Sequence, residues 1–145
     1  MSGIVVGIDG SHHASRALDW AMTEAGVRNA DLTVIAVNSV PQGYWTTKPV
    51  VLPGDEERVE EIRKSAQDAI DKAATGLGDQ QPKSVSVLAL SGYPAKTLID
   101  ASENSDLVVV GSRGGGGFGA LFLGSVSSQV VHHAKCPVVV VPHGR

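Results

Sequence analysis

The chain has 145 residues, of which 42% are hydrophobic and 19% charged, and its formal net charge is −3. This length and composition predict one ordered globular domain over residues 1–145 and exclude a disordered chain. The mildly acidic charge argues against binding to nucleic acid, which rewards a basic surface.

Membrane segments and disulfides are not expected either. No apolar run approaches the roughly twenty residues that span a bilayer, and no cationic stretch precedes the first run, Ile4 to Ile8, as it would in a signal peptide. The single cysteine, Cys136, excludes an intrachain disulfide, and we interpret it as a small buried apolar residue in preference to a reactive thiol. We therefore expect a soluble, cytoplasmic protein that does not bind a membrane.

Short apolar runs alternate with helical patterns from the start of the chain. The run Ile4 to Ile8 is apolar on both faces, as a strand covered on both sides would be. Apolar residues then recur at helical spacing from Ala14 to Ala25, and Gly26 or Asn29 is a suitable stop. Leu32 to Val37 predicts a second buried strand.

The segment from Asn38 to Gly54 reads as irregular, with Pro41, Tyr44 and Trp45 among its residues. A connection of this length is uncommon in a compact domain. It is either a lid over a ligand or a surface excursion, and the sequence does not decide between them.

The second half of the chain continues the alternation of strands and helices. Acidic residues at its start and glycines at its end delimit a long helix, and Pro94 is placed where a helix tolerates proline. The predicted elements are a helix over 55–77, a strand over 85–90, a short helix from Pro94, a strand over 107–110, a short helix after a glycine-rich loop, and a strand over 138–141. Apolar strands alternating with helices predict a parallel α/β sheet with helices on both faces.

The segment from Gly111 to Ser127 is the most unusual connection in the chain, because it follows a predicted strand and is rich in glycine. Ligands of open parallel sheets bind beyond the carboxyl ends of the strands. Consecutive N–H groups in a glycine turn form an anion-binding nest, and Ser125 is the expected N-cap of the next helix, whose N-terminus also attracts anions. We interpret the segment as a phosphate site to which the Ser125 and Ser127 hydroxyls contribute; the alternative is a flexible loop that binds nothing.

Other chemistries lack their motifs. No Gly-Lys pair followed by Ser or Thr is present, so the loop is not a Walker A motif. The adjacent histidines of the pairs His12–His13 and His132–His133 cannot share a helix face, and no zinc site is expected. We predict no catalytic residues and no metal ligands from the protein.

Three segments together resemble the universal stress protein family. Gly111-x2-Gly114-x9-Gly124-Ser125 is the spacing that marks its ATP-binding members, the opening Ile4 to Ser11 looks like the family's first strand and turn, and the ending His133 to Val141 looks like its last helix and strand. The resemblance covers essentially the whole chain.

This resemblance implies a Rossmann-like, five-stranded parallel sheet in the order 3-2-1-4-5, with Asp9 facing the glycine loop. In a universal stress protein, backbone at Val37 would read the adenine and Asp9 would lie in the nucleotide pocket; the alternative for Asp9 is a cap on its turn with Ser11. The ribose would lie near Gly111. The phosphates would be lined by Arg113, Gly114, Gly124, Ser125, Val126 and Ser127.

The resemblance also implies ATP as ligand, Mg²⁺ bound largely through phosphate oxygens and water, and a homodimer paired through Val138 to Val141. The loop offers one cation, Arg113, and no lysine, so we expect a nucleotide-dependent regulator of the stress response with slow ATP hydrolysis at most. The alternatives are a nucleotide-dependent enzyme of the same fold, an ATPase or nucleotidyl transferase, and a dimerising interaction module with an empty pocket.

Overall fold

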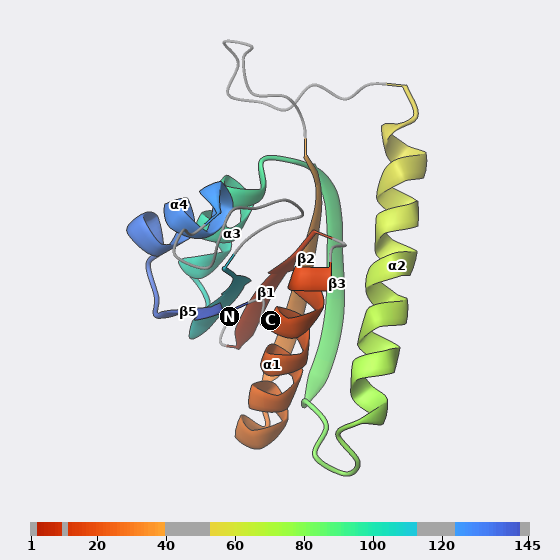
Figure 1. The fold of residues 1–145 in the computed structure, drawn as a ribbon, viewed down its shortest axis with the longest axis vertical. Coiled ribbons are helices and arrows are strands. Elements are labelled where there is room, and N and C mark those ends of the chain that lie inside the picture. The colour runs from red at the N-terminus through yellow and green to blue at the C-terminus, as the bar shows by residue number, and fades with distance from the viewer. Residues whose placement is uncertain (1–2, 10–11, 40–52, 113–123, 143–145) are drawn as a thin grey trace.

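The computed structural model describes residues 3–9, 12–39, 53–112 and 124–142 as a parallel sheet between two layers of helices (Figure 1). The strand order is β3-β2-β1-β4-β5, and every neighbouring pair is parallel. This confirms the predicted fold class and strand order. The elements are β1 (Ile4–Ile8), α1 (His12–Arg28), β2 (Asp31–Ser39), α2 (Asp55–Thr75), β3 (Ser84–Gly92), α3 (Pro94–Ser102), β4 (Leu107–Gly111), α4 (Ser125–His133) and β5 (Val138–Val141).

The first strand is buried on both faces, as its sequence predicts. Ile4 and Val6 pack in a cluster with residues of α1 and α2, and Val5 packs on the opposite face with residues of α3 and α4. All three side chains are at most 2% exposed. The helix pairs α1–α2 and α3–α4 therefore cover opposite faces of the sheet.

Strands β2 and β3 are longer than their apolar runs. They pair over nine residues, from Asp31↔Ser84 to Ser39↔Gly92. Asn38, expected to begin the irregular connection, is instead a strand residue: its Nδ2 donates to the Ser91 hydroxyl at 3.0 Å. Backbone pairing and the hydrogen bond of the Asn38 side chain extend the strand past the end of the apolar run Leu32 to Val37. Residues 40–52, with Tyr44 and Trp45, lie outside the described part of the chain.

The central strands β1 and β4 separate at their carboxyl ends. Their register runs only from Ile4↔Leu107 to Val6↔Val109. Pairing of β1 with β2 continues to Ile8, and pairing of β4 with β5 continues to Gly111. A gap therefore opens where the strand order reverses, which is the usual place for a ligand in such sheets.

The helices of the described residues include none that is long and apolar enough to cross a membrane.

Candidate functional site

A cavity of about 150 Å³ lies at this gap. It is built from the carboxyl ends of β1, β2 and β4 and from the N-terminal parts of α3 and α4. Its lining consists of Gly7, Ile8, Asp9, Ile35, Val37, Pro94, Leu98, Val110, Gly111, Gly124, Ser125, Val126 and Ser127.

The two ends of the cavity differ in chemistry. Ile35 and Val37 of β2, with Pro94 and Leu98 of α3, give it an apolar end. The other end is formed by the β4 terminus and the first turn of α4, from Gly124 to Ser127. A ligand that fills both ends needs an apolar part and a part that accepts hydrogen bonds.

The first turn of α4 begins one residue earlier than predicted. Gly124 is the N-cap, with extended backbone (φ −65°, ψ 164°) and no side-chain cap bond. Its N–H donates to the Ser112 carbonyl at 2.7 Å, and its own carbonyl accepts the Ser128 N–H at 2.9 Å. The prediction of Ser125 as N-cap is therefore wrong, because the backbone bond to Ser112 fixes Gly124 in that position and makes Ser125 the first helical residue.

This start of α4 leaves backbone donors at the cavity. The N–H groups of Ser125, Val126 and Ser127 have no acceptor within the helix, because the first intrahelical bond is donated by Ser128. The helix dipole adds partial positive charge at the same place. The geometry therefore suits an anionic group even with Ser125 displaced from the cap.

Ser127 has a different task from the one expected. Its side chain is only 4% exposed, and its hydroxyl donates to the Gly111 carbonyl. A serine hydroxyl has one proton to donate, so in this arrangement it joins α4 to the end of β4 and does not point its donor into the cavity. Ser125, by contrast, is exposed at the first position of the helix.

Asp9 is the sole ionisable side chain among the described residues that line the cavity. It directly follows β1 and is exposed. A carboxylate at this place attracts cations and repels an anion that has no counter-ion. The alternative role, capping a turn with Ser11, involves a residue outside the described ranges.

Seven of the nine predicted binding residues line this one cavity: Asp9, Val37, Gly111, Gly124, Ser125, Val126 and Ser127. Arg113 and Gly114 lie outside the described residues. The other six lining residues were not predicted: Gly7, Ile8, Ile35, Pro94, Leu98 and Val110. For Gly7 a signal existed, since a glycine inside an apolar strand often marks a close approach of another group.

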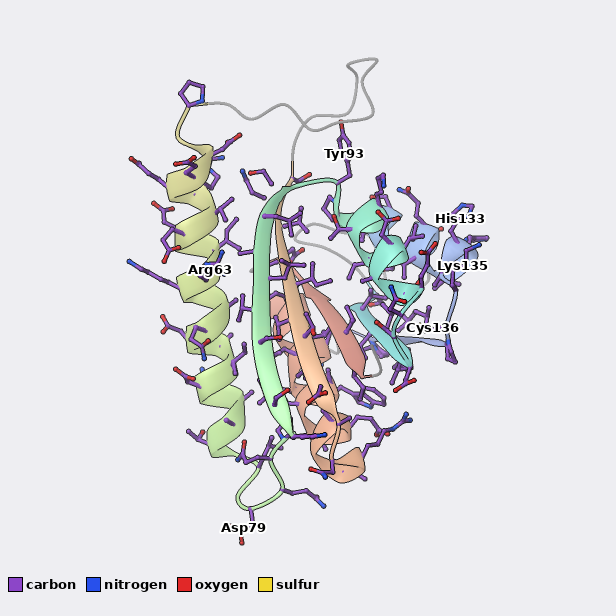
Figure 2. All side chains as sticks on the ribbon, turned by 180° about the vertical axis from the view of Figure 1, so that it is seen from behind. Arg63, Asp79, Tyr93, His133, Lys135 and Cys136 are labelled. Atoms are coloured by element: carbon purple, nitrogen blue, oxygen red, sulfur yellow. The ribbon has the colours of Figure 1, made fainter. Side chains whose placement is uncertain are left out.

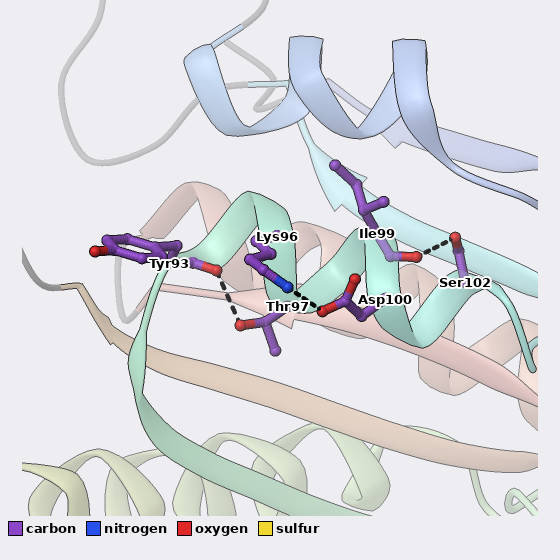
Figure 3. Close-up of polar contacts among 6 residues, drawn as sticks. All are labelled: Tyr93, Lys96, Thr97, Ile99, Asp100 and Ser102. Atoms are coloured by element: carbon purple, nitrogen blue, oxygen red, sulfur yellow. Dashed lines mark hydrogen bonds and ion pairs between the residues drawn. The ribbon is translucent and has the colours of Figure 1, made fainter. Parts of the chain in front are cut away.

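Helix α3 is held by its own side chains (Figure 3). The Thr97 hydroxyl donates to the Tyr93 carbonyl at 2.9 Å, and Lys96 pairs with Asp100 at 2.8 Å on the exposed face. Pro94 opens the helix, as predicted. The Thr97 bond and Pro94 lie at the helix start, and Pro94 lines the cavity.

Around α4 and β5 the described residues show no metal centre. No group of three or more His, Cys, Asp or Glu side chains there, or elsewhere in the described ranges, is placed to hold a metal ion. The ring Nδ1 of His132 lies 2.7 Å from the Ser128 carbonyl. Figure 2 shows His133, Lys135 and Cys136 on the same side of the molecule.

Cys136 is half-buried against the cluster formed with α3 and α4. Its Sγ lies 3.4 Å from the Pro137 carbonyl oxygen. Burial raises the pKa of the thiol; a hydrogen bond with the Val108 backbone partly opposes this rise, and the charge of Asp106 adds a smaller rise. A thiol with a raised pKa is a weak nucleophile, consistent with a packing role.

The fold and cavity define an α/β protein of the Rossmann-like class with a ligand cavity at its topological switch point. The chain belongs to the universal stress protein family: residues 1–142 match the model of the Universal stress protein family.

Individual relatives agree with this assignment. The chain is 37% identical over 142 residues to a universal stress protein of Mycolicibacterium smegmatis, which covers 98% of this chain and 48% of that protein. It thus spans about half the length of that relative. It is also 38% identical over 141 residues to a universal stress protein of Thermus aquaticus, here covering 95% of this chain and 96% of the relative.

A solved structure described as a universal stress protein in complex with cAMP has the same fold. It superimposes with a TM-score of 0.69 at 25% sequence identity, over 99% of this chain and 98% of the other.

Proposed function

We propose that this chain binds an adenine nucleotide, ATP with Mg²⁺, in the cavity between β1 and β4, and that it acts as a nucleotide-dependent regulator of the stress response. The observation that carries the proposal is the pairing of an apolar end with an end made of free helix N–H groups. A nucleotide has the same two parts, a flat base and a phosphate chain.

The chemistry of the two ends sets the orientation of the ligand. The base lies between β2 and α3, where backbone at Val37 reads its edge, and the ribose lies near Gly111. The phosphates accept the N–H groups of Ser125, Val126 and Ser127 and the Ser125 hydroxyl. Arg113 and Gly114 add to the phosphate site by the family's glycine spacing.

The solved relative in complex with cAMP supports an adenine nucleotide as the class of ligand. Its ligand has one phosphate, so the number of phosphates must be measured for this chain. The glycine spacing of the ATP-binding members is what favours ATP here.

Mg²⁺ fits the donors of the cavity only as a companion of the phosphates. Asp9 and Ser125 carry hard oxygen atoms at the cavity, but two such side chains do not make the octahedral cage that the ion requires. Asp9 would hold the ion directly or through water, and the remaining ligands would be phosphate oxygens and water. The ion would neutralise phosphate charge beside the Asp9 carboxylate.

We propose a binding protein with slow hydrolysis at most. Fast phosphoryl transfer needs a positioned nucleophile and strong stabilisation of charge. Of the described lining residues only Asp9 is ionisable, and the Ser127 proton is used in the bond to Gly111.

The edge strand β5 is the proposed homodimer contact. Val138, Val139 and Val140 are only half-buried, and β5 pairs with β4 on one side. A second copy of β5 would cover this apolar edge. We further propose that the protein acts in the cytoplasm, given its one free cysteine.

Isothermal titration tests the binding proposal. Protein freed of nucleotide by unfolding and refolding is titrated with MgATP, AMP and cAMP, and the supernatant of the unfolding step is analysed for released nucleotide. We expect binding of MgATP in preference to the monophosphates. Absence of heat for all three ligands, with native circular dichroism retained, would refute the proposal.

A turnover assay separates the binding protein from the enzyme. We expect release of phosphate from MgATP to be slow in the wild type. Rapid release that is lost in Asp9→Ala would favour the nucleotide-dependent enzyme.

A further inference from the structure

Gly7 makes a close contact in the cavity wall, which a side chain at this position would force apart. A methyl group on Gly7 would lie 2.7 Å from Cδ1 and 3.0 Å from Cδ2 of Leu98. Gly7 lies on β1 opposite Ile35, and its missing side chain would point to the α3 face, as that of Val5 does two residues earlier. The Leu98 methyls therefore lie in the space that Gly7 leaves.

The Leu98 side chain is closely packed and has little free space into which it could be displaced. It is 3% exposed and belongs to a closed cluster with Val5, Ile35, Val108, Val110 and Val130. Protein cores are packed to the density of crystals and do not absorb a displaced side chain without strain. The cavity is the open space beside Leu98, since Leu98, Gly7 and Ile35 all line it.

We propose that the Gly7–Leu98 contact sets the depth of the apolar end of the cavity and thereby the size of the base it accepts. A side chain on Gly7 drives the Leu98 methyls into the volume that the base occupies. Gly7 is thus a positioning residue that acts through Leu98. This inference rests on the proposed function, because it assigns the apolar end to the base.

Gly7→Ala is the first test. It adds one methyl group, about as large as a water molecule, beside a cavity of about 150 Å³. We expect the affinity for MgATP to fall at least about tenfold, because one methylene too many in an apolar pocket changes binding by ~10–200-fold. The ratio of the ATP and ADP dissociation constants should stay as in the wild type, since the phosphate end is untouched.

The double variant Gly7→Ala/Leu98→Val is the rescue. It adds one carbon at Gly7 and removes one carbon from Leu98, on the other side of the contact. Exchanges that conserve volume are tolerated best in a core. We expect it to recover most of the lost affinity. Gly76→Ala is the matched control, because a methyl group there would meet only the Ala73 carbonyl oxygen, at 3.7 Å.

A ligand-free measurement keeps this inference separate from the proposed function. In Gly7→Ala without nucleotide, a crystal structure should place the Leu98 methyls inside the cavity. If the wild type binds no nucleotide, the proposed function fails, and this structure still decides the Gly7–Leu98 contact. The inference is overturned if Leu98 keeps its place, if Gly7→Ala binds MgATP like the wild type, or if the ATP-to-ADP ratio changes.

Discussion

Ser127→Ala tests whether the start of α4 is held by the serine hydroxyl. The substitution removes the bond from Ser127 Oγ to the Gly111 carbonyl and changes little else, since alanine is a good helix former. Gly111 lies two residues past the last residue of β4 that pairs with β1, Val109. In Ser127→Ala the Gly111 carbonyl therefore loses its hydrogen-bond donor, and β1 supplies no replacement.

The magnitude follows from burial. A neutral hydrogen bond contributes about 1 kcal/mol net, and a buried acceptor left without a partner costs about 1–3 kcal/mol. Ser127 is 4% exposed, so water reaches the vacated position poorly. We expect the free energy of unfolding to fall by about 2 kcal/mol, which corresponds to a Tm lower by about 6 °C for a domain of this size.

Urea unfolding followed by circular dichroism measures this difference. Ser128→Ala is the control, because it makes the same chemical change at the next helix position, where the side chain is more exposed. The reasoning is refuted if Ser127→Ala and Ser128→Ala unfold within about 0.5 kcal/mol of each other, a difference typical of surface substitutions.

Two substitutions test the packing, and an alkylation measurement tests the cysteine. Gly26→Ala would place a methyl group 2.1 Å from the Gln80 carbonyl oxygen; urea unfolding should show a loss of about 3 kcal/mol, despite the gain in helix propensity. The Ser102 hydroxyl donates to the Ile99 carbonyl at 2.5 Å and accepts the Lys135 N–H at 2.9 Å. Ser102→Ala leaves that N–H without its partner, and the same assay should show a loss of about 2 kcal/mol. Burial raises the pKa of the Cys136 thiol, so alkylation by iodoacetamide should reach half its maximal rate at a higher pH in the folded protein than in denaturant. Equal half-points would show that the thiol is not shielded.

The strands could be predicted because runs such as Ile4 to Ile8 are apolar on both faces, whereas the strand order followed from the resemblance to the universal stress protein family. Val5 and Val6 pack on opposite sides of the sheet, and only a strand between two helix layers requires that pattern. The ends of β2 could not be predicted in this way. Asn38 is polar, and its place in the strand depends on Ser91, which is far away in sequence.

Of the family's glycine spacing, Gly111 and Gly124 line the cavity, whereas contacts that depend on packing were not predicted. The N-cap is Gly124 and not the predicted Ser125, because Ser112 supplies a backbone acceptor for Gly124. Preferences for capping side chains do not describe such a backbone bond. Leu98 had only the pattern of a core residue, and its place in the cavity depends on the absence of a side chain at Gly7. Such contacts between distant segments leave no local signal.

The separation of β1 and β4 also explains why the phosphate end of the cavity exists. Beyond Val109, the carbonyl groups of β4 that face away from β5 no longer find partners on β1. The Gly111 carbonyl accepts the Ser127 hydroxyl of α4 instead. The Gly124 N–H bonds to the carbonyl of Ser112, the residue after β4, whose own N–H bonds to Val141 of β5. The same two bonds that complete the end of β4 draw the start of α4 over the gap. The N–H groups of the first turn of α4 thereby lie at the cavity as a consequence of the strand register.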